Sequence, residues 1–132
     1  MIPQDYKRVI RHGHPRADYQ GHVLEHVLIA EAALGRPLPA GAEIHHGDND
    51  RQNNRNGNLV ICQDRAYHKL LHVRAVVVRF GGNPDTDRLC CACRRLKPLA
   101  AFNRATGNKA TGRQTQCREC QLSYQKSRSV AA

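Results

Sequence analysis

The sequence predicts an α+β protein in two parts, a larger N-terminal domain followed by a small cysteine-rich module. In the first part, apolar segments with helical and with extended spacing alternate around a long polar loop. In the second part, four of the six cysteines form two Cys-x-x-Cys pairs. Positive charge is also concentrated there. Residues 88–132 hold 10 Lys/Arg and one acidic residue, whereas residues 1–87 hold 11 Lys/Arg and 10 acidic residues.

The N-terminal part is predicted to contain a helix, a strand, a long polar loop, a second strand and a second helix, in this order. Apolar residues at helical spacing predict a helix within 21–34, with Gly35 as its C-terminal cap. The proline-containing segment 36–41 predicts a turn, and 42–46 predicts a short extended segment. Residues 47–57 lack any apolar side chain and predict a loop, whereas 58–62 predict a strand. Asp64 is expected to cap a helix that runs from Arg65 to about Arg79 and ends at Gly81 and Gly82.

The same pattern predicts the domain boundaries. We expect an N-terminal domain over 1–80, with its core at about 42–79, and a linker over 81–87. The cysteine module then covers 88–128, and 129–132 form a tail. Gln116 to Arg128 is expected to form a basic helix.

Composition restricts the class of protein. No apolar run approaches the ~20 residues that span a bilayer, and the first residues lack the apolar stretch of a secretory signal. We therefore expect an intracellular protein without membrane contact, whose reduced cysteines serve as metal ligands. A basic module beside a near-neutral domain indicates an anionic polymer as partner. The alternative is a merely solubilising basic tail, against which the cysteines argue.

Histidines flank the polar loop in a pattern that fits a metal site. His45 and His46 are neighbours in a predicted strand, so their side chains should point to opposite faces and can serve different purposes. His68 and His72 should lie one turn apart on one face of the following helix. The strand pair and the helix could therefore converge on one cation. A site with few imidazole ligands keeps coordination positions open, as catalysis requires.

These residues carry a resemblance. The segment from His45 through Asn58 to Cys62, followed by 67–72, resembles the HNH endonuclease family, particularly the small HNH proteins of phage genomes. The segments 21–31 and 34–39 also resemble those proteins, so the similarity covers about residues 12–74. It implies a treble-clef-like core of two antiparallel strands and a helix around one divalent cation, the ββα-metal fold, preceded by an N-terminal helix.

The resemblance also implies an activity, the hydrolysis of DNA to 5′-phosphate and 3′-hydroxyl ends. His46 would be the general base that activates water, a role suited to a neutral imidazole. His45 and His68 would hold the cation, with Mg²⁺ expected first and Mn²⁺ or others possible. His72 could replace His68 as ligand or contact phosphate. Asn58 would not touch the metal; its amide would bridge backbone groups across the loop.

Other polar residues of this region receive simpler interpretations. Asp48 and Asp50 do not open a calcium loop of the EF-hand type, because its required glycine and glutamate are missing. Asn53 and Asn54 are interpreted as turn formers. The remaining histidines of the N-terminal part are assigned no functional role: His12, His14, His22 and His26.

The paired cysteines predict a structural zinc site. Its four ligands would be Cys90, Cys93, Cys117 and Cys120. The module resembles the short treble-clef-like fingers that accompany phage HNH domains. Cys91 is interpreted as a bystander thiol and Cys62 as a core residue. Some basic residues of the finger are expected to contact DNA phosphates: Arg94, Arg95, Lys97, Arg113, Arg118 and Lys126.

Several alternatives stay open at this point. The chain could be a non-catalytic, zinc-containing nucleic-acid-binding protein, and a basic finger alone does not distinguish DNA from RNA. Monomer and homodimer fit equally, as do nicking and double-strand cleavage. The target sequence is not encoded in any recognisable motif, and a phage or prophage origin in a bacterial host is suspected from the resemblance. Homing, defence and genome packaging would all be compatible with it.

Overall fold

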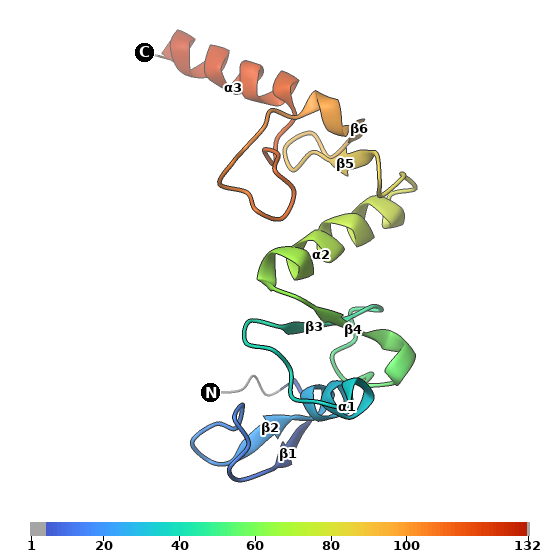
Figure 1. The fold of residues 1–132 in the computed structure, drawn as a ribbon. Coiled ribbons are helices and arrows are strands. Elements are labelled where there is room, and N and C mark those ends of the chain that lie inside the picture. Colours follow the sequence, from blue (N-terminus) through green and yellow to red (C-terminus); the bar gives the residue numbers. More distant parts are fainter. Residues whose placement is uncertain (1–4, 132) are drawn as a thin grey trace. The chain divides into compact units, whose positions relative to one another are not determined.

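A computed structural model describes residues 5–131 (Figure 1), and contacts divide the described chain into two compact units. The first ends at His68 and the second starts at Lys69. Within the described residues there are three helices longer than one turn and three two-stranded antiparallel sheets. This composition confirms the predicted α+β class. No helix within residues 5–131 is long and apolar enough to cross a membrane.

Seven elements run from the N-terminal part of the described chain to the end of the second α-helix. In chain order they are β1 (Arg8–Ile10), β2 (His22–Leu24), α1 (Glu25–Leu34), β3 (Glu43–His46), the 3₁₀ turn η1 (Asn56–Asn58), β4 (Leu59–Cys62) and α2 (Arg65–Arg79). The predicted order of helix, strand, loop, strand and helix is thus confirmed from α1 to α2.

The start of the predicted first helix is wrong. His22–Leu24 form β2, which pairs with β1 in a register that places Val9 opposite Val23. Val23 and Leu24 fit the helical spacing of the residues that follow them, but no Ser, Thr, Asp or Asn marks a helix start inside this stretch. Leu24 is the N-cap position of α1 and makes no side-chain capping bond. Gly35 ends α1 as predicted, with φ of 76° and its N–H bonded to the Glu31 carbonyl.

The core of the first unit lies between α1, β2 and β3. It consists of six buried residues, Val23, Val27, Ala30, Leu38, Ala42 and Ile44. The antiparallel pair of β3 and β4 sets Ile44 opposite Ile61 and His46 opposite Leu59. The Gly47 N–H continues this ladder to the Asn58 carbonyl at 2.8 Å. The two histidines are therefore fixed at the end of a paired strand, where the polar loop begins.

Helix α2 begins and ends where the sequence predicts. The Asp64 carboxylate accepts a bond from the Tyr67 N–H at 2.8 Å, which is an N-terminal cap. At the other end Gly81 has φ of 83°, and the Gly82 N–H bonds to the Val77 carbonyl at 2.9 Å. A left-handed glycine with this bond forms a Schellman cap.

The rest of the second unit is a short hairpin and a final helix. After α2 come β5 (Asp87–Leu89), β6 (Leu96–Pro98), the 3₁₀ turn η2 (Leu99–Ala101) and α3 (Arg118–Ala131). The last helix was predicted to end at Arg128, but it includes the first three residues of the predicted tail, while Ala132 lies outside the described residues. The buried cluster here is small and consists of Cys90, Phe102 and Cys117. A core of this size calls for a cross-link to hold it.

Candidate active site and metal centres

The adjacent histidines of β3 face different neighbours, as the alternation of a strand requires. The His45 ring lies against the His68 ring, with centroids 5.3 Å apart. The His46 ring instead lies edge-on to His26, at 5.0 Å and 88°. Both strand histidines are buried, with 5% and 6% of their surfaces exposed. The doublet therefore presents one imidazole to α2 and the other to α1.

Three imidazoles gather on the α2 side of the strand pair. His45, His68 and His72 each offer a ring nitrogen, and these atoms all lie within 4.8 Å of one another. His68 and His72 stand one turn apart on α2, so the continuous helix itself sets their spacing. The sequence left open whether His68 or His72 is the distal ligand. In this geometry both can take part, since the three donors converge.

The carboxylate of Glu43 contacts one histidine of this cluster. Its Oε2 lies 2.7 Å from Nδ1 of His68, and its Oε1 lies 4.0 Å from the Arg65 guanidinium. A carboxylate on one ring nitrogen directs the other nitrogen toward a metal and makes it a better donor. The Glu43 contact therefore leaves Nε2 as the nitrogen through which His68 could bind a cation.

On the opposite face, His46 contacts a side chain from the polar loop. Its Nε2 lies 2.9 Å from Oδ1 of Asn54, and Nδ2 of Asn54 donates to Oε2 of Glu25 at 2.7 Å. Tyr6 lies beside the rings of His46 and His26, with its ring centroid 6.2 Å from that of His46 and 5.4 Å from that of His26. Burial first, and then the proximity of His46, lower the pKa of His26 to about 4, so this neighbour is neutral at physiological pH.

Asn58 organises the loop between β3 and β4. Its Oδ1 accepts from the Asp48 N–H at 2.9 Å, and its Nδ2 donates to the Asn53 carbonyl at 2.8 Å. Nδ2 also donates to the Asp48 carboxylate at 2.8 Å. Bonds from Asn53, the Asp50 N–H and Asn58 together lower the pKa of Asp48. Asn58 therefore ties the first residues of the loop to its last ones.

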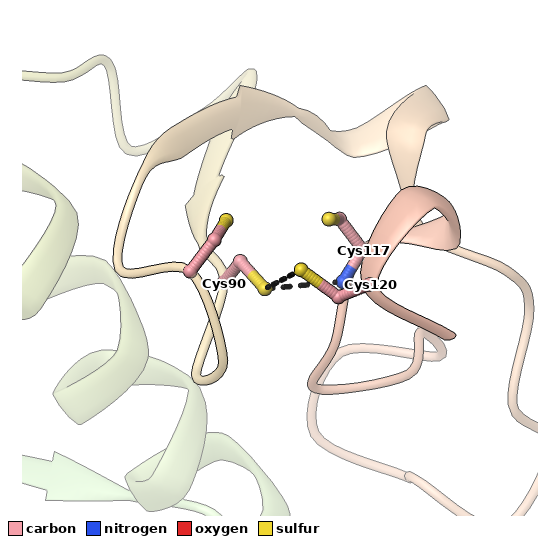
Figure 2. Close-up of side chains that lie close together, drawn as sticks. Cys90, Cys117 and Cys120 are labelled. Carbon is pink, nitrogen blue, oxygen red and sulfur yellow. Dashed lines mark hydrogen bonds between the residues drawn. The ribbon is translucent and has the colours of Figure 1, made fainter. Parts of the chain in front are cut away.

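The four paired cysteines also converge. The sulfurs of Cys90, Cys93, Cys117 and Cys120 all lie within 4.8 Å of one another, so they could hold a zinc ion. Figure 2 shows the Cys90 sulfur turned toward the Cys120 sulfur, 3.9 Å away, and toward the amide nitrogen of Cys117. Cys91 is exposed and does not belong to this group, whereas Cys62 is buried, as predicted.

Backbone N–H groups lower the pKa of Cys90 and Cys117, whereas the contact with Cys117 and then burial raise the pKa of Cys120 to about 12. The Cys90 sulfur accepts from the N–H groups of Ala92 at 3.4 Å and Cys117 at 3.3 Å. Burial is the largest single effect on Cys90 and raises its pKa, but these bonds and those from Cys93 bring the pKa down to about 6. Lys97 donates to the Cys117 sulfur at 3.4 Å and to Glu119 at 2.7 Å. Thiolate is the form that binds zinc.

The basic residues proposed to contact DNA fall into two groups. Arg95 and Lys126 are exposed, and so is Arg94, whose guanidinium lies 5.6 Å from the Phe80 ring centroid. The other three make hydrogen bonds within the finger. Lys97 bonds to the Cys117 sulfur and Glu119, Arg113 bonds to the Phe102 carbonyl, and Arg118, although exposed, bonds to Asn103 and the Ala100 carbonyl. The first group is therefore the more available to an external phosphate.

Sequence reasoning missed three residues that surround the paired strands. Glu43 was interpreted only as part of a strand, Asn54 only as a turn former, and Glu25 not at all. Glu43 lies two residues before His45, which puts both on the same face of a strand, and this periodicity could have found it. Nothing local marks the other two, because their contacts span 8 and 29 residues of sequence.

Comparison with known proteins gives one family. A family model described as HNH endonuclease matches residues 23–68, from β2 through the start of α2. The match includes His45, His46, Asn58 and His68 and ends before His72 and the cysteine cluster. Neither the curated proteins nor the solved structures gave a match.

Proposed function

We propose that this chain is a metal-dependent endonuclease that hydrolyses phosphodiester bonds of DNA, because residues 23–68 match a family model described as HNH endonuclease. The observation that carries the proposal is the convergence of His45, His68 and His72, with His46 as the next residue of the same strand. The proposed metal ligand and the proposed base would thus be neighbours in one strand. A purely structural site would have no use for that second imidazole.

The donor set fits a divalent cation. Three ring nitrogens within 4.8 Å of one another, one of them buried, can close around one ion and leave further positions to substrate and water. Bound there, the cation would neutralise the scissile phosphate and stabilise the departing 3′-oxygen. Imidazole suits Zn²⁺, Ni²⁺ and similar ions better than Mg²⁺, which prefers oxygen ligands. The donor set therefore favours a transition metal over the Mg²⁺ that the sequence first suggested.

His46 is proposed as the general base. A neutral imidazole accepts a proton from water, and the resulting hydroxide attacks phosphorus while the 3′-oxygen leaves. The position of His46 at the end of β3, next to the ligand His45, supports this role. Asn58 is proposed to act indirectly, since it holds the loop that follows both histidines.

The cysteine cluster is proposed to bind a structural zinc ion and to present basic residues to DNA. The second unit carries most of the excess charge and has little core of its own. Exposed Arg95 and Lys126 would contact phosphates without reading the sequence. The finger would thus raise affinity for DNA in general.

A plasmid-cleavage assay tests the proposal. The native chain, carrying its zinc, is incubated with supercoiled DNA and with Mg²⁺, Mn²⁺, Ni²⁺ or Zn²⁺ in parallel. We expect the native chain to cleave the plasmid and His46→Ala to lower the cleavage rate by about 100-fold to 10,000-fold, the usual contribution of a general base. The matched control is His12→Ala, because His12 is exposed and lies outside both clusters.

Two results would reject the proposal. One is an inactive native chain that still binds DNA tightly, which would favour the non-catalytic nucleic-acid-binding protein. The other is cleavage that His46→Ala and His12→Ala leave equally intact, because His46 would then not be the base.

A further inference from the structure

The amide of Asn54 joins two elements that are far apart in sequence. It donates from Nδ2 to the Glu25 carboxylate at 2.7 Å and receives His46 Nε2 at Oδ1, 2.9 Å away. Glu25 is the first residue of α1, His46 the last of β3, and Asn54 lies in the loop between β3 and β4. The three side chains form a continuous chain of hydrogen bonds that ends on the proposed base.

The chemistry of the end groups sets the direction of this chain. Carboxylate oxygens accept hydrogen bonds, so the face of Asn54 toward Glu25 must be its NH₂ group. The carbonyl oxygen of the amide then faces His46. Because a carbonyl only accepts, Nε2 of His46 must carry the hydrogen of that bond. In the neutral ring Nδ1 is then the nitrogen with the lone pair.

We propose that Asn54 and Glu25 are positioning residues for the reaction. They hold His46 in the tautomer with hydrogen on Nε2 and fix its ring plane, so that Nδ1 is the atom that takes a proton from water. This inference rests on the proposed role of His46 as general base. Neither residue is assigned a contact with substrate or metal; both act through His46.

The surroundings make this orientation specific. The rings of His26 and Tyr6 lie next to the ring of His46, at centroid distances of 5.0 and 6.2 Å. Such contacts restrict the ring plane but do not choose between its two nitrogens. Asn54, by contrast, makes a polar contact with Nε2 of His46 and so distinguishes this nitrogen from Nδ1. The loop that carries Asn54 is in turn held by Asn58 through the Asn53 carbonyl. Asn58 therefore reaches the base through Asn54.

Nuclear magnetic resonance of ¹⁵N-histidine-labelled protein tests the tautomer directly. The full chain is used with its zinc, at a pH where His46 is neutral, and His46→Ala assigns the signals. We expect the native His46 to show hydrogen on Nε2, and Asn54→Ala to show a mixture of both tautomers. The matched control, Asn53→Ala, changes the neighbouring asparagine, whose side chain bonds to Asp48. It should leave the native tautomer unchanged.

Kinetics on plasmid DNA supply the second measurement. We expect Asn54→Ala to lower kcat by about 10-fold to 100-fold, less than complete loss of a general base, with KM unchanged. Glu25→Gln should lower kcat by a smaller factor. The double variant should be no slower than Asn54→Ala, since the residues act in series. Asn54→Ser, which can restore an acceptor, should recover part of the activity.

The outcomes separate this inference from the proposed function. If the native chain cleaves DNA and needs His46, but native His46 carries hydrogen on Nδ1, the positioning role is wrong and the nuclease stands. The same follows if Asn54→Ala preserves both the tautomer and kcat. If His46→Ala cleaves normally, the base assignment itself fails, whatever the tautomer. The native spectrum decides the tautomer even if Asn54→Ala does not fold.

Discussion

Nδ1 of His68 lies 2.7 Å from Oε2 of Glu43, and Glu43 is two positions before His45 in the sequence. The same strand therefore supplies one proposed ligand and the carboxylate that orients another. A carboxylate of this kind raises the basicity of the imidazole and fixes the nitrogen that meets the metal. Glu43 is thus predicted to determine how tightly the histidine cluster binds its ion.

We expect Glu43→Ala to weaken metal binding at the histidine cluster by about 10-fold to 100-fold. Isothermal titration of the zinc-loaded chain with Ni²⁺ measures this affinity. Arg65→Gln is the matched control, because it removes the other charged neighbour of Glu43 and leaves His68 untouched. Equal affinities for Glu43→Ala and the native chain would show that the carboxylate does not support the ligand.

Removal of zinc is predicted to unfold the cysteine finger. Its buried cluster holds Phe102 and two of the proposed ligands, so little apolar core remains without the ion. We expect a strong chelator to abolish the circular-dichroism signal of α3 together with the bound zinc. The variant His68→Ala, which removes a ligand of the other cluster, should retain one zinc ion per chain and an intact finger. Persistence of the helix signal at zero zinc content would contradict the prediction.

Exposed basic residues of the finger are predicted to set the salt dependence of DNA binding. Each phosphate contact contributes about 0.9 to the slope of log affinity against log salt. The double variant Arg95→Gln/Lys126→Gln should therefore lower the slope by about 2. Salt titrations by fluorescence anisotropy provide the measurement, with exposed Arg36→Gln as control. An equal loss of slope in the control would show that phosphate contacts are not concentrated in the finger.

Glu31 is predicted to make the stability of the first unit depend on pH. It bonds to Nε2 of His14 at 2.8 Å and to the Leu38 N–H at 3.0 Å. Burial raises its pKa, but these bonds outweigh burial and leave the pKa below the ordinary 4.5. Because the folded-state pKa is the lower one, the stabilisation is present above pH 4.5 and is lost as pH falls through the folded value.

Urea unfolding of Glu31→Gln tests this dependence. At pH 7 we expect a loss of about 1.5–3 kcal/mol, the range for hydrogen bonds to a charged group. The difference from the native chain should disappear toward pH 3. Asp85→Asn removes an exposed carboxylate paired with Arg74 and should change stability by less than about 1 kcal/mol. A difference that persists at low pH would mean that the charge of Glu31 is not responsible.

Local signals explain which elements the sequence could predict. Helix α2 carries a capping Asp64 at its start and Gly81 at its end, so both boundaries are encoded within a few residues. The strand β2 has no such signal, because its three residues share the helical spacing of α1. Its partner β1 is equally short, and only their pairing distinguishes them from a loop.

The candidate site divides in the same way. The histidines could be found because alternation in a strand and the turn of a helix are both local rules. That ring nitrogens of His45, His68 and His72 lie near one another is a tertiary feature, which no local sequence rule describes, so the sequence left the distal ligand open. The bonds from Asn54 to His46 and Glu25 arise only when α1 meets the loop, which periodicity does not describe.

The pairing of β3 with β4 makes the two adjacent histidines sensitive to insertions and deletions. A slip of one residue in this register would turn His45 toward α1 and His46 toward α2, and so exchange a ligand for a base. The bond from the Gly47 N–H to the Asn58 carbonyl fixes the alignment at the point where the loop begins. Length changes in the loop between Asp48 and Asn53 can leave that alignment intact. Gain or loss of a single residue within β3 cannot.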